Sequence, residues 1–401
     1  MKQAWAWAWA CAALSVGLLC SAAASAESRA QVLGADMNRS TVRVPVLGKP
    51  DQTLVATVFK PDGKGPFPLL VMNHGTDASQ GFKPENMAAS APVTHYWLAR
   101  AFVERGYMVI SPMRRGVAGS GGQFDARACD IAANGVVHAA DIAATLAYAA
   151  TLPQVDASAM VVAGQSHGGL ATLGLLASDL PQAKQVRAGI VFSGGLFHAS
   201  PSCPWSPTRL VNALGAYGQR VALPTLWLYA PNDQTFEPPL VAEMLKAYLA
   251  GGAQAQFVSV LPNGNNGNNG NSGLADSGGH GFVRWRSSTA AWWPLVEDYL
   301  KARGLPTAQR HRVAELYAAA PSGFAALEDA SKVPTTAGGQ ARYRTFLSRP
   351  SPRAFVVGAQ GEVFSGSFEA GAVAPTLAAC EAQTRAPCKV YAVDDAVVYQ
   401  P

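Results

Sequence analysis

The chain has 401 residues, of which 49% are hydrophobic and 14% are charged, and its formal net charge is +5 at pH 7. At about 100–200 residues per domain, this length is enough for a large core and for more than one compact unit. The charged share lies below the roughly 25% typical of globular proteins, so the composition indicates a folded chain rich in small residues. No basic run stands out, and nucleic acid is therefore not an expected partner.

The first 26 residues have the pattern of an export signal. Lys2 supplies a positive charge, residues 5–19 form an apolar stretch, and Ala24-Ser25-Ala26 fits the small-residue cleavage rule. We therefore expect cleavage before Glu27 and an exported protein, periplasmic or secreted. The apolar stretch is short for a membrane span of about 20 residues, so no stable membrane insertion is expected after cleavage, and a retained anchor is the weaker alternative.

Four cysteines follow the expected cleavage site: Cys129, Cys203, Cys380 and Cys388. An even number in an exported protein indicates disulfides, with three possible connectivities. Because the last two are close together and flank a turn-like stretch, we expect the pairs Cys380–Cys388 and Cys129–Cys203. Free buried thiols are the alternative. The Cys and His spacings are not typical of a zinc site, and no metal or other cofactor is expected.

Strand and helix patterns alternate from residue 41 to residue 301. Residues 41–46 and 54–61 alternate in polarity like the two strands of an antiparallel hairpin. Continuous apolar runs, typical of strands buried on both faces, follow at 67–75, 107–112, 159–163, 188–195, 224–230 and 255–261. Helical patterns are found at 96–106, 136–150, 169–180, 240–249 and 292–301.

This alternation predicts an α/β fold: a mostly parallel, twisted sheet with helices on both faces. In such a sheet, ligands bind at the carboxyl ends of the strands. The expected units are a signal at 1–26, a main domain at 27–325, a linker at 326–341 and a small α+β module at 342–401.

Three segments outside the alternating pattern have their own expectations. Residues 263–273 contain only Asn, Gly and Ser, and we expect a loop because nothing there can be buried. Residues 311–320 are expected to continue or follow the last helix of the main domain. The C-terminal module is expected to be βαβ-like, with the disulfide Cys380–Cys388 as a staple.

One pentapeptide, Gly164-Gln165-Ser166-His167-Gly168, lies between the strand pattern at 159–163 and the helix pattern at 169–180. In a sharp strand-to-helix turn of this kind, only glycine fits two residues either side of the serine, and the hydroxyl is exposed above the sheet. We therefore predict Ser166 as a nucleophile. The alternative is a turn of small residues with an incidental serine.

A serine hydroxyl needs a histidine base, and the histidine needs a carboxylate to orient it. After such a turn the chain order is serine, acid, histidine. Asp233 follows the strand pattern at 224–230, and His280 stands in a glycine-rich stretch after the last strand. These two are the predicted acid and base. Asp276 is the rival acid, whereas Asp156 precedes the serine and has the wrong order.

The oxygen anion of a tetrahedral intermediate needs backbone N–H donors. One comes from the residue after the nucleophile, here His167, and one from the loop after an early strand. For the second donor Thr76 is the prediction, with Asp77 almost equally suitable. The His167 side chain either lines the pocket or only packs at the turn.

These stretches resemble the α/β-hydrolase family, nearest to its dienelactone-hydrolase-like and prolyl-oligopeptidase-like esterases. The resemblance covers about residues 40–305 and implies ester, thioester or amide hydrolysis through an acyl-enzyme, without a cofactor. The chain departs from the family pattern in three ways: its nucleophile is not the cysteine of true dienelactone hydrolases, an Asn/Gly run precedes His280, and residues 342–401 lie outside the pattern. The matching stretches are Asn73-His74-Gly75, Arg115-Gly116 with Gly119-Ser120-Gly121, Gly164 to Gly169, Pro231-Asn232-Asp233 and Gly279-His280-Gly281.

The expected function is that of an exported serine esterase acting on a small-molecule or polymer-attached ester. The short segment at 195–223 leaves little room for a large lid, so small or medium acyl groups are expected. A serine peptidase or aminoacyl amidase on the same scaffold is one alternative, although the roughly 40 residues before the first buried strand leave no room for the extra domain that such peptidases usually carry. The other alternative is a non-catalytic binding protein.

Overall fold

The computed structural model describes residues 30–76, 84–125, 129–197, 203–261, 279–314, 320–347, 349, 353–367 and 372–401. The expected export signal, the Asn/Gly run and Asp276 lie outside these ranges, and so does Asp77. Within the described ranges, no helix combines the length and the apolar character that a membrane crossing requires.

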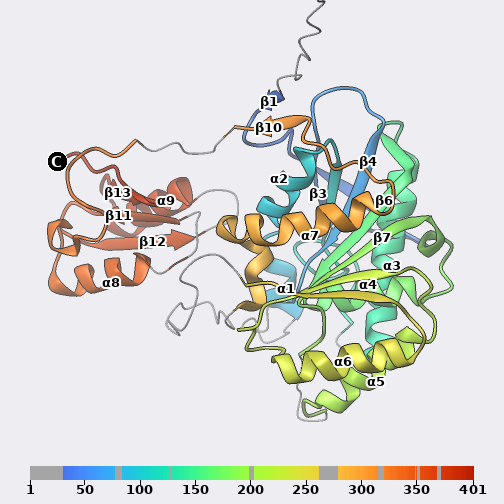
Figure 1. The fold of residues 1–401 in the computed structure, drawn as a ribbon. Helices are drawn as coiled ribbons and strands as arrows, with labels where there is room; N and C mark the ends of the chain where they lie inside the picture. The colour runs from blue at the N-terminus through green and yellow to red at the C-terminus, as the bar shows by residue number, and fades with distance from the viewer. Residues whose placement is uncertain are drawn as a thin grey trace, which may run out of the picture.

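An eight-stranded sheet forms the centre of the main domain (Figure 1). Its strand order is β2-β3-β5-β4-β6-β7-β8-β9. β2, β3 and β5 pair in antiparallel fashion, while all other pairs are parallel, which confirms the predicted mostly parallel sheet. The strands are β2 (Ser40–Val46), β3 (Lys49–Phe59), β4 (Phe67–Asn73), β5 (Met108–Pro112), β6 (Val155–Gln165), β7 (Val186–Phe192), β8 (Thr225–Tyr229) and β9 (Ala255–Ser259).

Helices cover both faces of this sheet (Figure 1). Successive side chains of a strand point to opposite faces. In β4, Leu69 and Val71 accordingly pack in one core and Leu70 and Met72 in the other. The first core is covered by α3 (Ile131–Ala150), α4 (His167–Leu176), α5 (Pro207–Gly218) and α6 (Pro238–Ala250), and the second by α2 (Tyr96–Val103) and α7 (Thr289–Lys301). The short helix α1 (Pro84–Ala89) follows β4.

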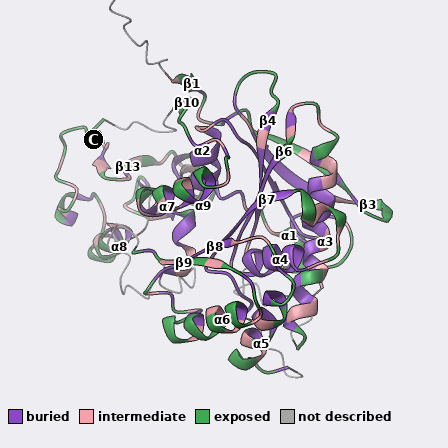
Figure 2. Ribbon diagram, turned by 45° about the vertical axis from the view of Figure 1, so that its right-hand side comes forward, coloured by how far each residue is buried: buried purple, intermediate pink, exposed green. Residues whose placement is uncertain are grey.

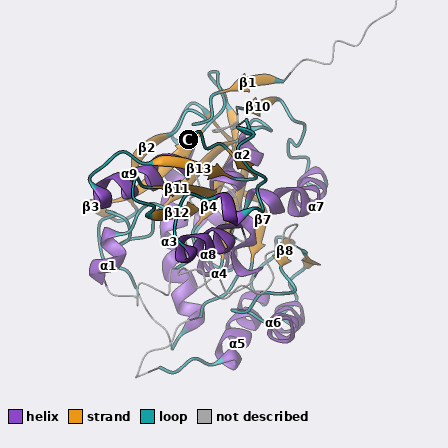
Figure 3. Cartoon of the chain, turned by 90° about the vertical axis from the view of Figure 1, so that its left-hand side faces the viewer, coloured by secondary structure: helices purple, strands orange, loops and turns teal. Residues whose placement is uncertain are grey.

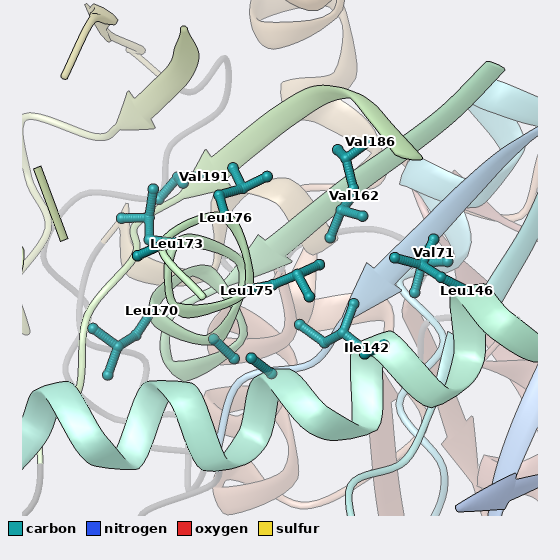
Figure 4. Packing of buried hydrophobic residues seen from close by; sticks show 14 of the residues in the cluster. Val71, Ile142, Leu146, Val162, Leu170, Leu173, Leu175, Leu176, Val186 and Val191 are labelled. Carbon is teal, nitrogen blue, oxygen red and sulfur yellow. The ribbon is translucent and has the colours of Figure 1, made fainter. Parts of the chain in front are cut away.

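Helix α4 is apolar on all sides because it is enclosed by the sheet and by α3. All ten of its residues are buried. Figure 4 shows its leucines between Ile142 and Leu146 of α3 and the valines of the sheet. In Figure 2 β7 and α4 are mainly buried, whereas α6 presents an exposed outer face. The residue that precedes α4 is therefore held by one of the most enclosed helices of the domain.

Three expectations about the helices differ from the structure. α3 begins at Ile131 rather than at residue 136, because the Asp130 carboxylate caps it by accepting a hydrogen bond from the Ala133 N–H at 2.9 Å. α5 has no counterpart in the predicted helices. The described part of 311–320 is not helical: β10 (His311–Val313) pairs in parallel with β1 (Gln31–Leu33).

The C-terminal module contains an antiparallel sheet with the order β12-β11-β13-β14 (Figures 1 and 3). The α+β class is confirmed, but the expected βαβ connection is wrong, because β11 and β13 run antiparallel. Part of the expected linker at 326–341 is packed rather than extended: Ala330 and Val333 join the module's core. The elements are α8 (Ala337–Leu347), β11 (Arg353–Val357), β12 (Val363–Ser367), α9 (Val373–Thr384), β13 (Lys389–Val393) and β14 (Ala396–Val397).

Both expected disulfides are present. Cys129–Cys203 joins the residues before α3 to the segment before α5, with Cα atoms 5.5 Å apart. Cys380–Cys388 joins α9 to the residue before β13, with Cα atoms 6.3 Å apart. Disulfides persist in oxidising compartments, so this pairing indicates such a location for the protein.

The close crossing of α3 and α4 gives a test of the packing. A Cβ atom at Gly174 would lie 2.6 Å from the carbonyl carbon of Gly135. Gly174→Ala therefore forces the helices apart, and we expect it to lower the free energy of unfolding by about 1–3 kcal/mol. At Gly215 in α5 the nearest atom is 3.6 Å away. Gly215→Ala should be neutral or stabilising by up to about 1 kcal/mol. Urea unfolding of both variants measures the difference, and equal stabilities would contradict the close crossing.

Candidate active site

Ser166 lies in a strained turn between β6 and α4, with φ 54° and ψ −122°. A side chain at Gly164 would place Cβ 2.1 Å from the Gly168 carbonyl oxygen. A side chain at Gly168 would place Cβ 2.1 Å from the Asn73 carbonyl oxygen. Only glycine fits at these two positions, because neighbouring backbone lies too close for a side chain, as the pentapeptide predicted. Backbone strain of this kind is found where a structure holds a functional residue in place.

Backbone hydrogen bonds fix this turn on two neighbouring segments. The Ser166 N–H donates to the Phe192 carbonyl at 3.0 Å, and the Gly195 N–H donates to the Ser166 carbonyl at 3.0 Å. Ser166 itself is half-buried, while the residues on either side of it are buried. The serine is thus a partly accessible position on a rigid support.

Asp233 and His280, the predicted acid and base, are hydrogen-bonded. His280 Nδ1 lies 2.9 Å from Asp233 Oδ2, and the carboxylate also accepts the N–H groups of Thr235 at 2.8 Å and Phe236 at 2.9 Å. Because an ionised carboxylate only accepts hydrogen bonds, Nδ1 carries the imidazole proton and Nε2 has the lone pair. The Asp233 side chain has no exposed surface, and that of His280 is 12% exposed.

Two contacts hold His280 at the edge of the sheet where Ser166 lies. Gln165, next to the serine, donates from Nε2 to the His280 carbonyl at 3.3 Å. The rings of Phe236 and His280 have centroids 5.3 Å apart, and Phe236 packs so closely on Gly195 that a Cβ there would lie 2.6 Å from its ring. By contrast, Asp156 lies at the start of β6, at the end of that strand remote from the serine.

The loop after β4, residues 74–76, packs against the serine turn. A Cβ atom at Gly75 would lie 3.2 Å from Ser166 Cβ and 2.4 Å from Gln165 Oε1. Thr76, predicted as an oxyanion donor, is therefore next to a residue that packs against Ser166. Its hydroxyl forms a 2.7 Å hydrogen bond with His167 Nδ1.

The His167 side chain is turned into the protein. It is 1% exposed, and its Nε2 donates to Asn134 Oδ1 at 2.5 Å while Nδ1 accepts from Thr76 and Arg114. Of the two expectations for this side chain, packing at the turn is therefore the one found. Its backbone N–H remains the predicted donor, at the first position of α4.

In the sheet, β5 lies between β3 and β4, and β6 is followed by the strained serine turn and α4. The chain has the α/β-hydrolase fold. The sequence model of the X-Pro dipeptidyl-peptidase family (S15) matches residues 51–216, which include β3 to β7 and the serine turn. No curated protein sequence matches the chain significantly.

Solved structures similar to this α/β-hydrolase include esterases and peptidases. A putative dienelactone hydrolase from Klebsiella pneumoniae has 18% identity and a TM-score of 0.43, over 66% of this chain and 98% of that one. An esterase from Pyrococcus furiosus has 14% identity and a TM-score of 0.44, over 67% and 93%. Dipeptidyl peptidase 4 from Porphyromonas gingivalis has 18% identity and a TM-score of 0.41, over 55% and 31%.

A buried polar cluster lies behind the site, and its pairing was not foreseen. Arg115 forms an ion pair with Asp141 at 2.6 Å, and His138 stacks on Phe124 with ring centroids 4.9 Å apart. The sequence feature that could have predicted this cluster is a polar stripe on the largely apolar α3. Asn134, His138 and Asp141 recur at helical spacing on one face of that helix. A cavity of about 10 Å³ beside this stripe is the size of a single water molecule, too small for a substrate.

Burial keeps two histidines of this cluster neutral. It lowers the pKa of His138 to about 3, helped by the charge of Arg114, and it lowers the pKa of His74 well below its usual range. His138 Nε2 donates to the Asp125 carbonyl at 2.9 Å. His74 Nδ1 donates to the Gly75 carbonyl at 2.6 Å, and its Nε2 accepts the Arg114 N–H. Neutral rings suit a cluster that already contains two arginines.

The lowered pKa of His138 predicts acid sensitivity. Between its usual 6.5 and about 3, the unfolded chain binds a proton at His138 that the folded chain does not. The stability from the neutral ring is therefore complete above pH 6.5 and is lost as the pH falls toward 3. When the pH is lowered from 8 to 5, protonation of His138 in the unfolded chain should lower the free energy of unfolding by about 2 kcal/mol. Each pH unit below the usual pKa corresponds to about 1.4 kcal/mol.

Urea unfolding of the wild type and of His138→Gln at both pH values tests this. Glutamine takes up no proton, so the unfolding free energy of the variant should fall less between pH 8 and pH 5, whatever its absolute stability. An equal decline in both proteins would contradict the assignment.

Proposed function

We propose that this α/β-hydrolase is an exported serine esterase that cleaves carboxylic esters through an acyl-enzyme. The observation that carries the proposal is the Asp233–His280 hydrogen bond at the edge of the sheet where the strained Ser166 turn lies. Each member occupies the chain position that the fold imposes: serine after one strand, acid after a later one, histidine after the last.

The residues have distinct roles in this reaction. His280 Nε2 takes the proton of the Ser166 hydroxyl as the oxygen attacks the ester carbonyl, and Asp233 stabilises the imidazolium that forms. The backbone N–H groups of His167 and Thr76 bind the oxygen anion of the tetrahedral intermediate. His280 then delivers the proton to the leaving alcohol. Water, activated by the same imidazole, releases the acid and restores the serine.

The surroundings of the site favour esters with small or medium acyl groups. Phe236 presents its ring to the imidazole, and Phe197 and Trp205 form an aromatic pair shortly after Gly195, whose N–H bonds to Ser166. Phe197 is 45% exposed. Such rings offer apolar surface to the acyl or alcohol part of an ester, either on a small molecule or on a polymer.

A serine peptidase is the second candidate, because the matching family model is that of a dipeptidyl-peptidase family. A peptidase of that kind has to bind the ammonium group of its substrate, which calls for an available carboxylate. Among the described residues of the site and of the cluster behind it, two carboxylates are engaged: Asp233 by His280 and Asp141 by Arg115.

Mutation of the proposed triad gives the main kinetic prediction. Ser166→Ala should abolish hydrolysis of p-nitrophenyl acetate, and Asp233→Asn should lower kcat about 10³–10⁴-fold because the imidazole loses its orienting anion. Asp156→Asn, at the remote end of β6, is the matched control and should keep wild-type kcat. Ester turnover by Ser166→Ala at the wild-type rate would exclude this serine as the nucleophile.

A substrate panel separates the two candidates. We expect kcat/KM on p-nitrophenyl esters of two to six carbons to exceed that on aminoacyl and X-Pro p-nitroanilides by at least about 100-fold, because p-nitroaniline is the poorer leaving group. Faster cleavage of the X-Pro anilide than of every ester would replace the esterase by a peptidase.

A further inference from the structure

Arg114 is a buried cation that the proposed reaction does not use. It follows β5, is 5% exposed, and among the described residues no carboxylate lies within ion-pair distance of it. Burial lowers the pKa of Arg114 to about 9 and Asp141 opposes the shift, so the guanidinium is charged at neutral pH. Burying a charge without a counter-ion costs free energy unless its N–H donors form hydrogen bonds.

The guanidinium donates to all three residues of the loop after β4. Nη2 donates to the carbonyl of His74 and, at 2.9 Å, to the carbonyl of Gly75. Nη1 donates to the Thr76 hydroxyl at 3.0 Å and to His167 Nδ1 at 2.6 Å. One side chain thus binds both residues whose N–H groups are the proposed oxyanion donors.

These bonds determine where the Thr76 N–H points. In a trans peptide the carbonyl and the following N–H point in opposite directions. Because the Gly75 carbonyl points at Arg114, the Thr76 N–H points away from it. Within the described part of the chain that N–H has no protein acceptor, while Gly75 packs against Ser166.

We propose that Arg114 is a positioning residue for the oxyanion hole: by binding the carbonyls of His74 and Gly75, it holds the Thr76 N–H toward the oxygen of the tetrahedral intermediate on Ser166. The inference rests on the proposed function. Arg115 has different partners: its guanidinium donates to the Asp141 carboxylate and to the Val137 carbonyl.

The test compares ester hydrolysis by Arg114→Ala and Arg114→Lys with the wild type. A lost oxyanion donor costs about 10²–10³ in kcat. We expect a kcat loss of that size for alanine and a KM within about threefold of wild type. For lysine we expect a smaller kcat loss of about 10–100-fold, because its ammonium is a compact point charge without the planar fork of the guanidinium. Arg105→Ala is the control: Arg105 is also largely buried, stacked on Trp293 at 4.1 Å, and its loss should leave kcat unchanged.

Guanidinium ion supplies a readout that a purely structural role would not change. Added at a concentration that leaves the wild type folded and active, it should restore part of the kcat of Arg114→Ala, whereas ammonium should not. Lysine retains the charge and the buried stem, so Arg114→Lys keeps the test valid if the alanine variant does not fold.

The outcomes separate the two proposals. An active wild type with both Arg114 variants within threefold of its kcat would overturn the positioning role alone, and so would a loss that appears in KM instead of kcat. A wild type whose ester turnover does not exceed that of Ser166→Ala would overturn the esterase and the positioning role together. A kcat loss with guanidinium rescue supports both.

Discussion

The site depends on one close approach of backbone, between the end of β4 and the start of α4. Asn73 and Gly168 are so near that any side chain on Gly168 would overlap the Asn73 carbonyl. Because α4 is enclosed on every side, it cannot withdraw to make room. The turn before it is therefore compressed into the strained conformation of Ser166, and the loop that follows β4 is brought against this serine. Packing of the apolar core thus sets the geometry of the polar site.

Behind this contact the molecule buries charge, where the rest of the core is apolar. Arg114, Arg115 and Asp141 lie among neutral histidines, and the cost of their burial is offset by hydrogen bonds to backbone carbonyls and by one ion pair. Such a network has few alternative arrangements because each missing partner would leave a buried group unsatisfied. Through Arg114 it binds all three residues of the irregular loop at 74–76.

Much of the architecture could be predicted from local patterns. The apolar runs identified every strand of the parallel part of the sheet, and the two expected disulfides are present. The Asp233–His280 pair was predictable because chain order is imposed by the fold, and 47 residues of separation did not hide it. These predictions rested on the hydrophobic pattern of the strands and on the serine, acid, histidine chain order of the fold.

The errors have physical causes. The first turn of α3 was missed because its start is defined by the Asp130 cap rather than by apolar periodicity. Residues 311–313 form a strand only because β1, nearly the whole domain away in sequence, supplies its partner. The role proposed for Arg114 could not be predicted from the sequence because it rests on bonds to two backbone carbonyls, which every residue possesses. The C-terminal module has an order of antiparallel strands that no local pattern encodes.

The central claim is that Ser166 is an activated nucleophile, and covalent labelling tests it most directly. The mature protein is incubated with a fluorophosphonate, digested, and the modified residue is located by mass spectrometry. We expect one phosphonate per chain, on Ser166, with slower labelling in Asp233→Asn because the imidazole is no longer oriented. A folded, unlabelled wild type, or a phosphonate on another serine, would contradict it.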